Sequence, residues 1–412
     1  MASLILEISR TSPEDCSRSK KVKSALVRTK VLFLKKEEYM KKLGFGTMRL
    51  PRLNPDDPAS IDIEQFKKMA DLFMERGFTY FDTAYPYHQE CSEGAVKEAV
   101  VERFSRDSFV LADKMPILRV TKTEDYQMYF DEQLRRCGVD YFDYYLLHNL
   151  GRDRYINTEK FGGFPFIEKL KRDGYVRNIG FSFHDDAQTL DRILTDHPEV
   201  DFVQLQINYV DWNSIAIESG KCYEVAQKHG KKVMVMEPVK GGALVKLPDA
   251  AIAKFNEFYA PMNDPALTPA SLAIRYAASL SDVQIVLSGM SDLAQLDNNT
   301  TYMQDFKPLS EEEYKLVDDI TEILGSTGTI QCTSCRYCTE VCPKNINVPE
   351  YFGLYNMHAV TGNKSNMYYE RFSMNHGKAS ECIKCGLCEK NCPQHIDIRK
   401  KLEDFAALYE QE

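Results

Sequence analysis

The feature that most limits how this chain can fold is an eightfold alternation of two kinds of segment between residues 43 and 300. Short apolar runs rich in β-branched and aromatic residues predict strands, and a stretch with helical periodicity follows each of them. The predicted strands are 43–48, 79–82, 109–113, 144–147, 177–181, 202–206, 233–236 and 284–287, and the predicted helices are 63–76, 92–102, 125–137, 165–172, 187–194, 217–229, 269–280 and 292–299. Eight such units predict an α/β fold, the (β/α)8 TIM barrel. A doubly wound sheet is the alternative, but no G-x-G-x-x-G motif follows the first strand.

Polar residues stand at the C-terminal ends of seven of these predicted strands. They are Asp82, Lys114, His148, Ser182, Gln204, Asn208, Glu237 and Ser288. A single aspartate in such a place is usually a helix cap, and a single histidine is usually an ordinary hydrogen-bonded polar residue. In a barrel, however, the C-terminal ends of all strands meet at one mouth, where the active sites of this fold lie. The set therefore predicts an active site at that mouth.

Eight motifs in this segment resemble those of the aldo/keto reductase family. They are LGFGTMRLP (43–51), FDTAYPYHQECSEG (81–94), ADKMP (112–116), YYLLHNL (144–150), RNIGFSFHDD (177–186), VQLQINY (203–209), VMEPVKGGAL (235–244) and LSGMSDLAQLDNN (287–299). The resemblance implies an oxidoreductase that interconverts a carbonyl and an alcohol with a nicotinamide hydride. It also implies a catalytic tetrad, which would be Asp82, Tyr87, Lys114 and His148.

Within that tetrad Tyr87 would be the general acid/base. A lysine ammonium close to a phenol favours the phenolate, so Lys114 is expected to lower the pKa of Tyr87. Asp82 would hold Lys114 charged and oriented, and His148 would position the carbonyl oxygen of the substrate.

The same resemblance implies residues that bind NADP or NAD. Gly46, Thr47, Met48, Asp82 and Met236 would line the cofactor, and Ser182 and Gln204 would face the nicotinamide amide. The residues toward the adenosine phosphate would be Ser288, Gly289, Met290, Gln295, Asn298 and Asn299. Many family members place a lysine and an arginine on the last loop to bind the 2′-phosphate of NADP, whereas this chain has Gly289 and Gln295 there. Phe183 replaces an asparagine that usually follows the nicotinamide-facing serine, and Met236 replaces a tyrosine that often stacks on the ring. Fewer charged hydrogen bonds predict weak discrimination between NADP and NAD.

Eight of the twelve cysteines lie between residues 332 and 392, in two copies of the pattern C-x2-C-x2-C-x3-C-P. Three closely spaced thiolates can bind three irons of a [4Fe–4S] cluster, and in two-cluster ferredoxins the fourth ligand comes from the other motif. The pattern thus predicts one cluster on Cys332, Cys335, Cys338 and Cys392, and a second on Cys382, Cys385, Cys388 and Cys342. Structural zinc is the alternative, but it needs four ligands, so a third cysteine at this spacing would be redundant. An amphipathic stretch at 348–360 favours a mainly helical two-cluster domain.

The composition limits the partners of the protein. A net charge of −9 argues against a broad nucleic-acid-binding surface. No apolar run is long enough for a membrane span, and the N-terminus lacks the pattern of a signal peptide, so we expect a cytoplasmic protein.

The chain is expected to divide into four parts. These are an N-terminal extension at 1–39, the barrel at 40–305, a connecting helix and linker at 306–330, and a ferredoxin-like domain at 331–412. The extension carries nine basic and five acidic residues and no clear amphipathic period. Two interpretations stay open for it: a disordered basic tail, or a segment that is not natively translated because synthesis starts at Met40.

The motifs leave two functional hypotheses. In the first, the barrel is an enzyme for a small-molecule carbonyl or alcohol, and the clusters exchange electrons with a redox partner. Hydride carries two electrons whereas each cluster takes one, so either a flavoprotein partner converts between them or the clusters serve structure or sensing. A ferredoxin is a further candidate for the redox partner. In the second, the barrel is degenerate and the protein is mainly an electron-transfer or docking module. The intact tetrad favours the first.

Overall fold

The computed structural model describes residues 40–411, apart from positions 216, 327, 331, 333–335 and 393. The predicted N-terminal extension at 1–39 and the predicted cluster ligand Cys335 therefore lie outside the described residues. The chain from Lys42 onward forms one compact unit. None of the helices in the described part of the chain combines the length and the apolarity needed to cross a membrane.

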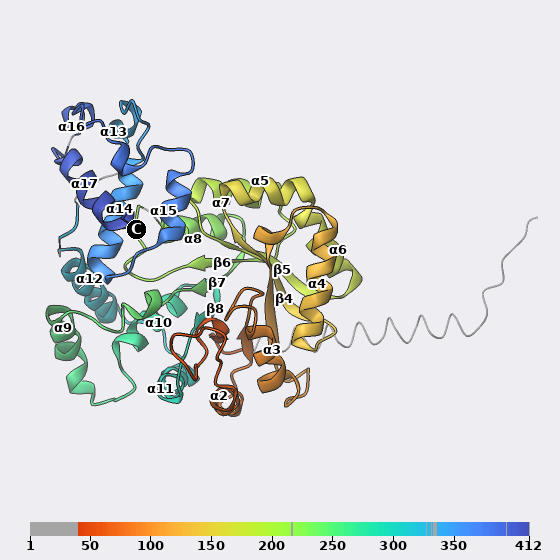
Figure 1. The fold of residues 1–412 in the computed structure, drawn as a ribbon. Coiled ribbons are helices and arrows are strands. Elements are labelled where there is room, and N and C mark those ends of the chain that lie inside the picture. The colour runs from red at the N-terminus through yellow and green to blue at the C-terminus, as the bar shows by residue number, and fades with distance from the viewer. Residues whose placement is uncertain are drawn as a thin grey trace, which may run out of the picture. The chain divides into compact units, whose positions relative to one another are not determined.

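Eight parallel strands close into a barrel, in which each strand pairs with its neighbours in chain order (Figure 1). The sheet closes between the first and last strands, where Leu43 lies opposite Val286. The strands are β1 (Leu43–Gly46), β2 (Tyr80–Asp82), β3 (Val110–Met115), β4 (Phe142–Leu150), β5 (Val176–Phe183), β6 (Phe202–Gln206), β7 (Lys232–Met236) and β8 (Val283–Ser288). The predicted TIM barrel is confirmed, and its closure excludes the doubly wound alternative.

Helices cover the outside of the barrel (Figure 1). They are α2 (Ile63–Glu75), α3 (Ser92–Val96), α4 (Glu124–Cys137), α5 (Arg152–Phe161), α6 (Gly163–Asp173), α7 (Ala187–Asp196), α8 (Ser219–Lys228), α9 (Asp249–Tyr259), α10 (Pro269–Ser279), α11 (Leu293–Gln304) and α12 (Glu311–Gly325). Two of them, α5 and α9, are absent from the sequence-based prediction. In α5 only Tyr155 and Thr158 are buried, so this highly charged segment has almost no apolar stripe.

Side chains on the strands alternate between the barrel interior and the layer beneath the helices. Tyr80 and Tyr144 meet inside the barrel, with their ring centroids 5.3 Å apart. Phe81, the next residue on β2, instead contacts Phe73 of α2 with a centroid distance of 5.3 Å. Because the period of a strand is two, Asp82 returns to the interior face at the C-terminal end of β2.

Gly180 marks a place where β5 and β6 approach closely. A Cβ at this position would overlap the carbonyl oxygen of Phe202 on β6 and lie 2.9 Å from atoms of its ring. Because the obstacle is partly a strand backbone, we expect Gly180→Ala to lower the free energy of unfolding by about 2–3 kcal/mol. Thermal unfolding followed by circular dichroism measures this change.

A matched control for this substitution lies in α3. No described atom lies within 4 Å of a Cβ added at Gly94, so Gly94→Ala should leave the stability unchanged or raise it by up to about 1 kcal/mol. If Gly180→Ala proved as stable as this control, the close approach of β5 and β6 would be wrong.

The C-terminal domain is mainly helical, as the sequence predicts. Its elements are α13 (Tyr337–Glu340), α14 (Val348–Thr361), α15 (Asn366–Ser373), η6 (Ala379–Glu381), α16 (Leu387–Lys390) and α17 (Ile398–Tyr409). An aromatic stack holds α14 against α17: the Phe405 ring lies 5.0 Å from that of Tyr351 and 4.6 Å from that of Tyr409. This domain therefore has its own apolar core, which the cysteines border.

Helix α12 is fixed to the outside of the barrel. The Glu313 carboxylate accepts from the guanidinium of Arg275, on α10, at 2.5 and 3.0 Å, and from the hydroxyl of Tyr259, on α9, at 2.7 Å. All three groups are buried, and the paired hydrogen bonds of this contact set the position of α12 on the barrel. Helix α12, which leads to the cysteine domain, is thus held against the barrel.

Candidate active site and cluster-binding sites

A buried ion pair connects the ends of β2 and β3. Lys114 Nζ lies 2.5 Å from Asp82 Oδ1 and donates a second hydrogen bond to the carbonyl oxygen of Thr83 at 2.7 Å. Gln204, on β6, lies with its amide nitrogen 3.5 Å from the other carboxylate oxygen of Asp82. Burial alone would lower the pKa of Lys114, but Asp82 and Tyr87 outweigh it and raise that pKa. The lysine is therefore held charged at the barrel mouth.

Tyr87 and His148 lie beside this pair. Tyr87 is in the turn after β2, where its backbone N–H donates to the carbonyl oxygen of Ala84 at 3.1 Å. Lys114 Nζ lies 4.9 Å from the centroid of the Tyr87 ring. The His148 ring, near the end of β4, lies edge-on to the Tyr87 ring with the centroids 6.0 Å apart. The structure thus brings all four predicted tetrad residues together.

Burial sets the protonation of Tyr87 and His148. It raises the pKa of the Tyr87 hydroxyl, and the Lys114 ammonium offsets this effect only in part. Lys114 thus lowers the pKa of Tyr87 as expected, but desolvation, which the sequence did not reveal, outweighs the lysine and makes the net shift upward. Burial, followed by the charge of Lys114, holds the pKa of His148 well below its usual range. At neutral pH Tyr87 keeps its proton and His148 is uncharged.

A buried polar network behind the mouth fixes the backbone of Lys114. Its N–H donates to Asp113 Oδ1 at 2.8 Å, and its carbonyl oxygen accepts from Gln133 Nε2 at 3.0 Å. Gln133 also donates to Glu93 Oε1 at 3.1 Å and accepts from the Tyr145 hydroxyl at 2.5 Å. Burial, and then the neighbouring Glu93 carboxylate, raise the pKa of Asp113 well above its usual value. These residues are not among the predicted site residues, although Glu93 lies inside one of the recognised motifs.

The residues predicted to face the nicotinamide are oriented by the chain itself. The Thr47 hydroxyl donates to the carbonyl oxygen of Asp82 at 3.0 Å and lies 2.7 Å from Ser92 Oγ. Ser182 Oγ accepts from the backbone N–H of Asn149 at 2.7 Å. Both hydroxyls are buried, so their orientation does not depend on solvent.

Three other residues predicted to line the cofactor lie at strand ends or just beyond. Gly46 ends β1 and Met236 ends β7, and both strand ends open at the barrel mouth. Met48 lies on the short helix η1 (Thr47–Arg49), and 55% of its surface is exposed. Asn208, another predicted strand-end residue, instead holds the loop after β6, donating to Asp211 Oδ2 at 2.7 Å.

The polar side chains at the end of β8 and in the first turns of α11 are engaged within the chain. The contacts are Asn299 Nδ2 to Ser288 Oγ (3.0 Å), Thr268 Oγ1 to Asn298 Oδ1 (3.0 Å) and Ser291 N to Gln295 Oε1 (2.9 Å). Met290 is fully buried in the main hydrophobic core. Among the residues predicted to meet the adenosine phosphate, this leaves the backbone of Gly289 to bind it.

A cation that is not among the predicted site residues lies across this loop. An added Cβ at Gly289 would lie 3.2 Å from carbons of the Arg49 side chain, and one at Gly241 would lie 3.2 Å from Arg49 Nη2. The same guanidinium is 3.7 Å from Glu237 Oε1, and 46% of the Arg49 side chain is exposed. Arg49 directly follows Met48 in the first recognised motif, so the sequence carried a signal for it.

The two cysteine motifs contribute to each other's cavity. One cavity is lined by Cys342 of the first motif together with Cys382, Cys385 and Cys388 of the second. Another is lined by Cys332 and Cys338 of the first motif together with Cys392 of the second. The described thiols thus come together in the crossed arrangement that a two-cluster ferredoxin uses, and this donor set fits the two cubane clusters.

Known families match both parts of the chain. Residues 42–322 match the model of the aldo/keto reductase family, and residues 331–397 match that of a 4Fe-4S dicluster domain. An aldo-keto reductase from Mycolicibacterium vanbaalenii is 27% identical over 260 residues, which are 60% of this chain and 81% of that protein. The glyoxal reductase of Bacillus subtilis is 26% identical over 187 residues, or 39% of this chain and 63% of that protein.

A solved structure agrees with the barrel. The aldo-keto reductase from Klebsiella pneumoniae in complex with NADPH has a TM-score of 0.54 and 24% sequence identity, and the match covers 68% of this chain and 91% of that chain. This likeness concerns the fold, while the dicluster match favours iron–sulfur clusters over the zinc alternative. The chain therefore belongs to the aldo/keto reductase family of oxidoreductases and carries a 4Fe-4S dicluster domain after its barrel.

Proposed function

We propose that the barrel interconverts a carbonyl and an alcohol, with Tyr87 as the general acid/base. The observation that carries this proposal is the buried Asp82–Lys114 pair beside Tyr87 and His148. A scaffold gains little from such a pair, because well-packed apolar residues would be at least as stable in its place. A proton donor that must become a phenolate during turnover does need a fixed cation next to it.

The side chains divide the work at the carbonyl oxygen. NADPH or NADH would supply the hydride to the carbonyl carbon. Tyr87, which burial keeps protonated, would give its proton to the oxygen as negative charge develops there. Lys114 would stabilise the remaining phenolate of Tyr87. Neutral His148 would donate an N–H hydrogen bond to the carbonyl oxygen of the substrate.

For the C-terminal domain we propose two [4Fe–4S] clusters that exchange single electrons with a flavoprotein or ferredoxin. Their ligands would be Cys332, Cys335, Cys338 and Cys392 for one cluster, and Cys382, Cys385, Cys388 and Cys342 for the other. Each cluster takes one electron, so the two clusters together could hold the two electrons that a hydride carries.

One observation favours the alternative that the barrel is mainly a scaffold for electron transfer. The side chains predicted to meet the adenosine phosphate are hydrogen bonded within the chain, so a dinucleotide would have to displace those contacts or use the backbone. Anaerobic protein titrated with NADPH and NADH, followed by assays with a panel of aldehydes, separates the two. Binding together with aldehyde-dependent oxidation of the cofactor supports the enzyme. Binding of neither cofactor, with reversible cluster reduction retained, supports the scaffold.

We further expect Arg49 to contribute to dinucleotide affinity, because it is a half-exposed cation lying across the loop after β8. One charge-assisted hydrogen bond is worth about 1.5–3 kcal/mol, so Arg49→Met should weaken binding by about 10- to 100-fold. Quenching of tyrosine and tryptophan fluorescence by each cofactor measures the change. Arg52→Met, an exposed arginine just after η1, is the matched control. Equal affinities for the two variants would exclude Arg49 from the site.

A further inference from the structure

Helix α15 of the cysteine domain lies against the C-terminal ends of three barrel strands. The amide of Asn149, on β4, donates to Met367 Sδ at 3.6 Å. The Tyr368 hydroxyl lies 3.4 Å from the Nδ1 atom of His184, which follows β5, and donates to Gln206 Oε1 on β6 at 3.4 Å. The barrel mouth therefore has one wall that the other domain supplies.

Two arginines lie at this wall, one from each domain. Arg154, in the first turn of α5, donates to the carbonyl oxygen of Asn149 at 2.9 Å, directly beside the tetrad residue His148. Within the described residues it forms no ion pair with a carboxylate. A half-buried guanidinium with five donors thus has a single carbonyl oxygen as its hydrogen-bond partner among the described residues.

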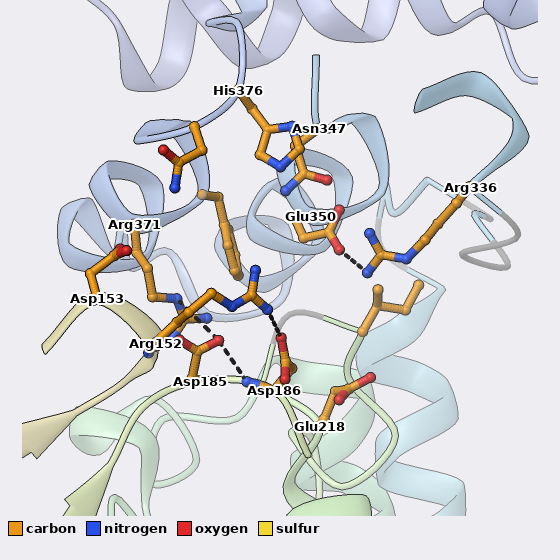
Figure 2. Close-up of a pocket in the computed structure, with 13 residues that line it drawn as sticks. Arg152, Asp153, Asp185, Asp186, Glu218, Arg336, Asn347, Glu350, Arg371 and His376 are labelled. Carbon is orange, nitrogen blue, oxygen red and sulfur yellow. Dashed lines mark hydrogen bonds and ion pairs between the residues drawn. The ribbon is translucent and has the colours of Figure 1, made fainter. Parts of the chain in front are cut away.

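Arg371 comes from α15. Its Nε atom lies 4.0 Å from Asp185 Oδ1, and its guanidinium carbon lies 4.6 Å from the ring centroids of both Tyr368 and Phe372. Figure 2 shows the side chain pointing toward Asp185, beside a cavity of about 120 Å³ that both domains line. Asp185 already accepts from the backbone N–H of Arg152 at 2.8 Å. Arg371 Nη1 has no hydrogen-bond partner among the described residues.

Asn149 connects the two arginines: its carbonyl oxygen accepts from Arg154, and its amide donates to Met367, which lies one helical turn before Arg371 on α15. Burial and the charge of Arg371 lower the pKa of Arg154, and the acids that oppose this shift do so only in part. Those acids are Asp153, Asp185 and Glu370. Burial, Arg371 and Arg154 together lower the pKa of His184 to about 3, so neither His184 nor His148 adds charge at neutral pH. The junction thus keeps two partly desolvated positive charges near each other, an arrangement that an anion would stabilise.

We propose that the substrate carries an anionic group, a carboxylate or a phosphate, which binds to Arg154 and Arg371 while its carbonyl carbon faces Tyr87 and His148. Guanidinium forks match both anions through paired hydrogen bonds. The inference rests on the proposed function, and it narrows the substrates to oxo acids, hydroxy acids and phosphorylated aldehydes or alcohols. It also makes α15 of the cysteine domain part of the substrate site.

The test compares matched carbonyl pairs. One pair is para-carboxybenzaldehyde and its methyl ester, and the other is glyceraldehyde 3-phosphate and glyceraldehyde. In the holoprotein, kcat/KM should favour the anionic member of at least one pair by about tenfold or more, since one charge-assisted hydrogen bond is worth at least that factor. The pair that shows the preference identifies carboxylate or phosphate as the recognised group.

Substitutions of the arginines show which residues cause the preference for the anionic substrate. Arg154→Gln and Arg371→Gln should each reduce the ratio of the two kcat/KM values by about tenfold, mainly through KM for the anionic member. Arg154→Lys should restore part of the ratio. Arg172→Gln is the matched control, because Arg172 is 67% exposed at the C-terminal end of α6 and lies 3.8 Å from Asp173. Absorption of the clusters and circular dichroism confirm that each variant is folded and loaded.

The outcomes separate this inference from the proposed function. Equal rates for both members of each pair, or ratios that no arginine variant changes, would overturn the anion site while leaving carbonyl chemistry in place. Failure to turn over any of the four carbonyls would contradict the proposed function instead. In that case calorimetry measures the affinity of the wild-type protein and of Arg154→Gln for para-carboxybenzaldehyde. The anion site requires an affinity at least tenfold weaker in the variant. Binding that is the same in both proteins would exclude it.

Discussion

Tyr87→Phe is expected to reduce carbonyl turnover by about 10²- to 10⁴-fold, the usual contribution of a positioned general acid. The substitution keeps the ring beside His148 and removes only the transferable proton, so the protein should remain folded with its clusters loaded. Steady-state oxidation of NADPH in the presence of an aldehyde measures the loss. Because burial raises the pKa of Tyr87, its acid form persists throughout the neutral range. In the wild-type protein, the rate of reduction should therefore not fall until the pH exceeds the ordinary tyrosine value of about 10.

Tyr85→Phe is the matched control for this experiment. Tyr85 lies two residues earlier in the same loop, and its hydroxyl donates to Glu132 Oε2 at 3.1 Å instead of lying at the Lys114 ammonium. Its removal should leave turnover within about a factor of three. If Tyr87→Phe kept comparable activity, the general acid would have to be another group, and His148 would be the next candidate because it faces the same space.

Cys342→Ser should remove about half of the iron and sulfide from a protein that otherwise contains about eight of each. The reason is the crossed arrangement, in which Cys342 of the first motif lines the cavity of Cys382, Cys385 and Cys388. Anaerobic iron and sulfide assays measure the loss, and electron paramagnetic resonance of the reduced protein shows which cluster signal survives.

Two further variants make this result decisive. Cys385→Ser removes a ligand from the same cavity as Cys342, whereas Cys338→Ser removes one from the other cavity. The spectrum of Cys342→Ser should match that of Cys385→Ser. A match to Cys338→Ser would show that the motifs do not exchange ligands. Cys91→Ser, at an exposed cysteine outside both motifs, should leave the metal content unchanged.

The barrel and the tetrad could be predicted from sequence because local rules place most of their parts. Strand periodicity turns Asp82, Lys114 and His148 inward, and the parallel order of the strands brings their C-terminal ends to one mouth. Fixed spacing in the cysteine motifs likewise encodes the ligand sets. These are features that a short stretch of chain carries by itself.

Other parts depend on three-dimensional packing that no local pattern encodes. The pKa of Tyr87 is raised because the assembled mouth desolvates it, although its neighbour Lys114 acts in the opposite direction. Arg154 and Arg371 lie in different domains, and only the contact of α15 with β4 and β5 relates them. Helix α9 is an intermediate case, since Ala251, Phe255 and Tyr259 repeat every four residues and could have been recognised.

If α15 forms part of the substrate site, as we propose, its position makes substrate binding depend on iron supply. A domain built around clusters loses much of its folding free energy when the metal is removed, and α15 belongs to such a domain. The tetrad itself lies wholly within the barrel, so it would survive the loss of iron, but Met367, Tyr368 and Arg371 would no longer be held at its mouth. Exposure to oxygen or starvation for iron should then weaken the binding of an anionic substrate, while the barrel groups proposed to handle hydride and proton stay in place. The clusters would then support substrate binding by holding α15 at the barrel mouth, whether or not electrons pass between them and the substrate.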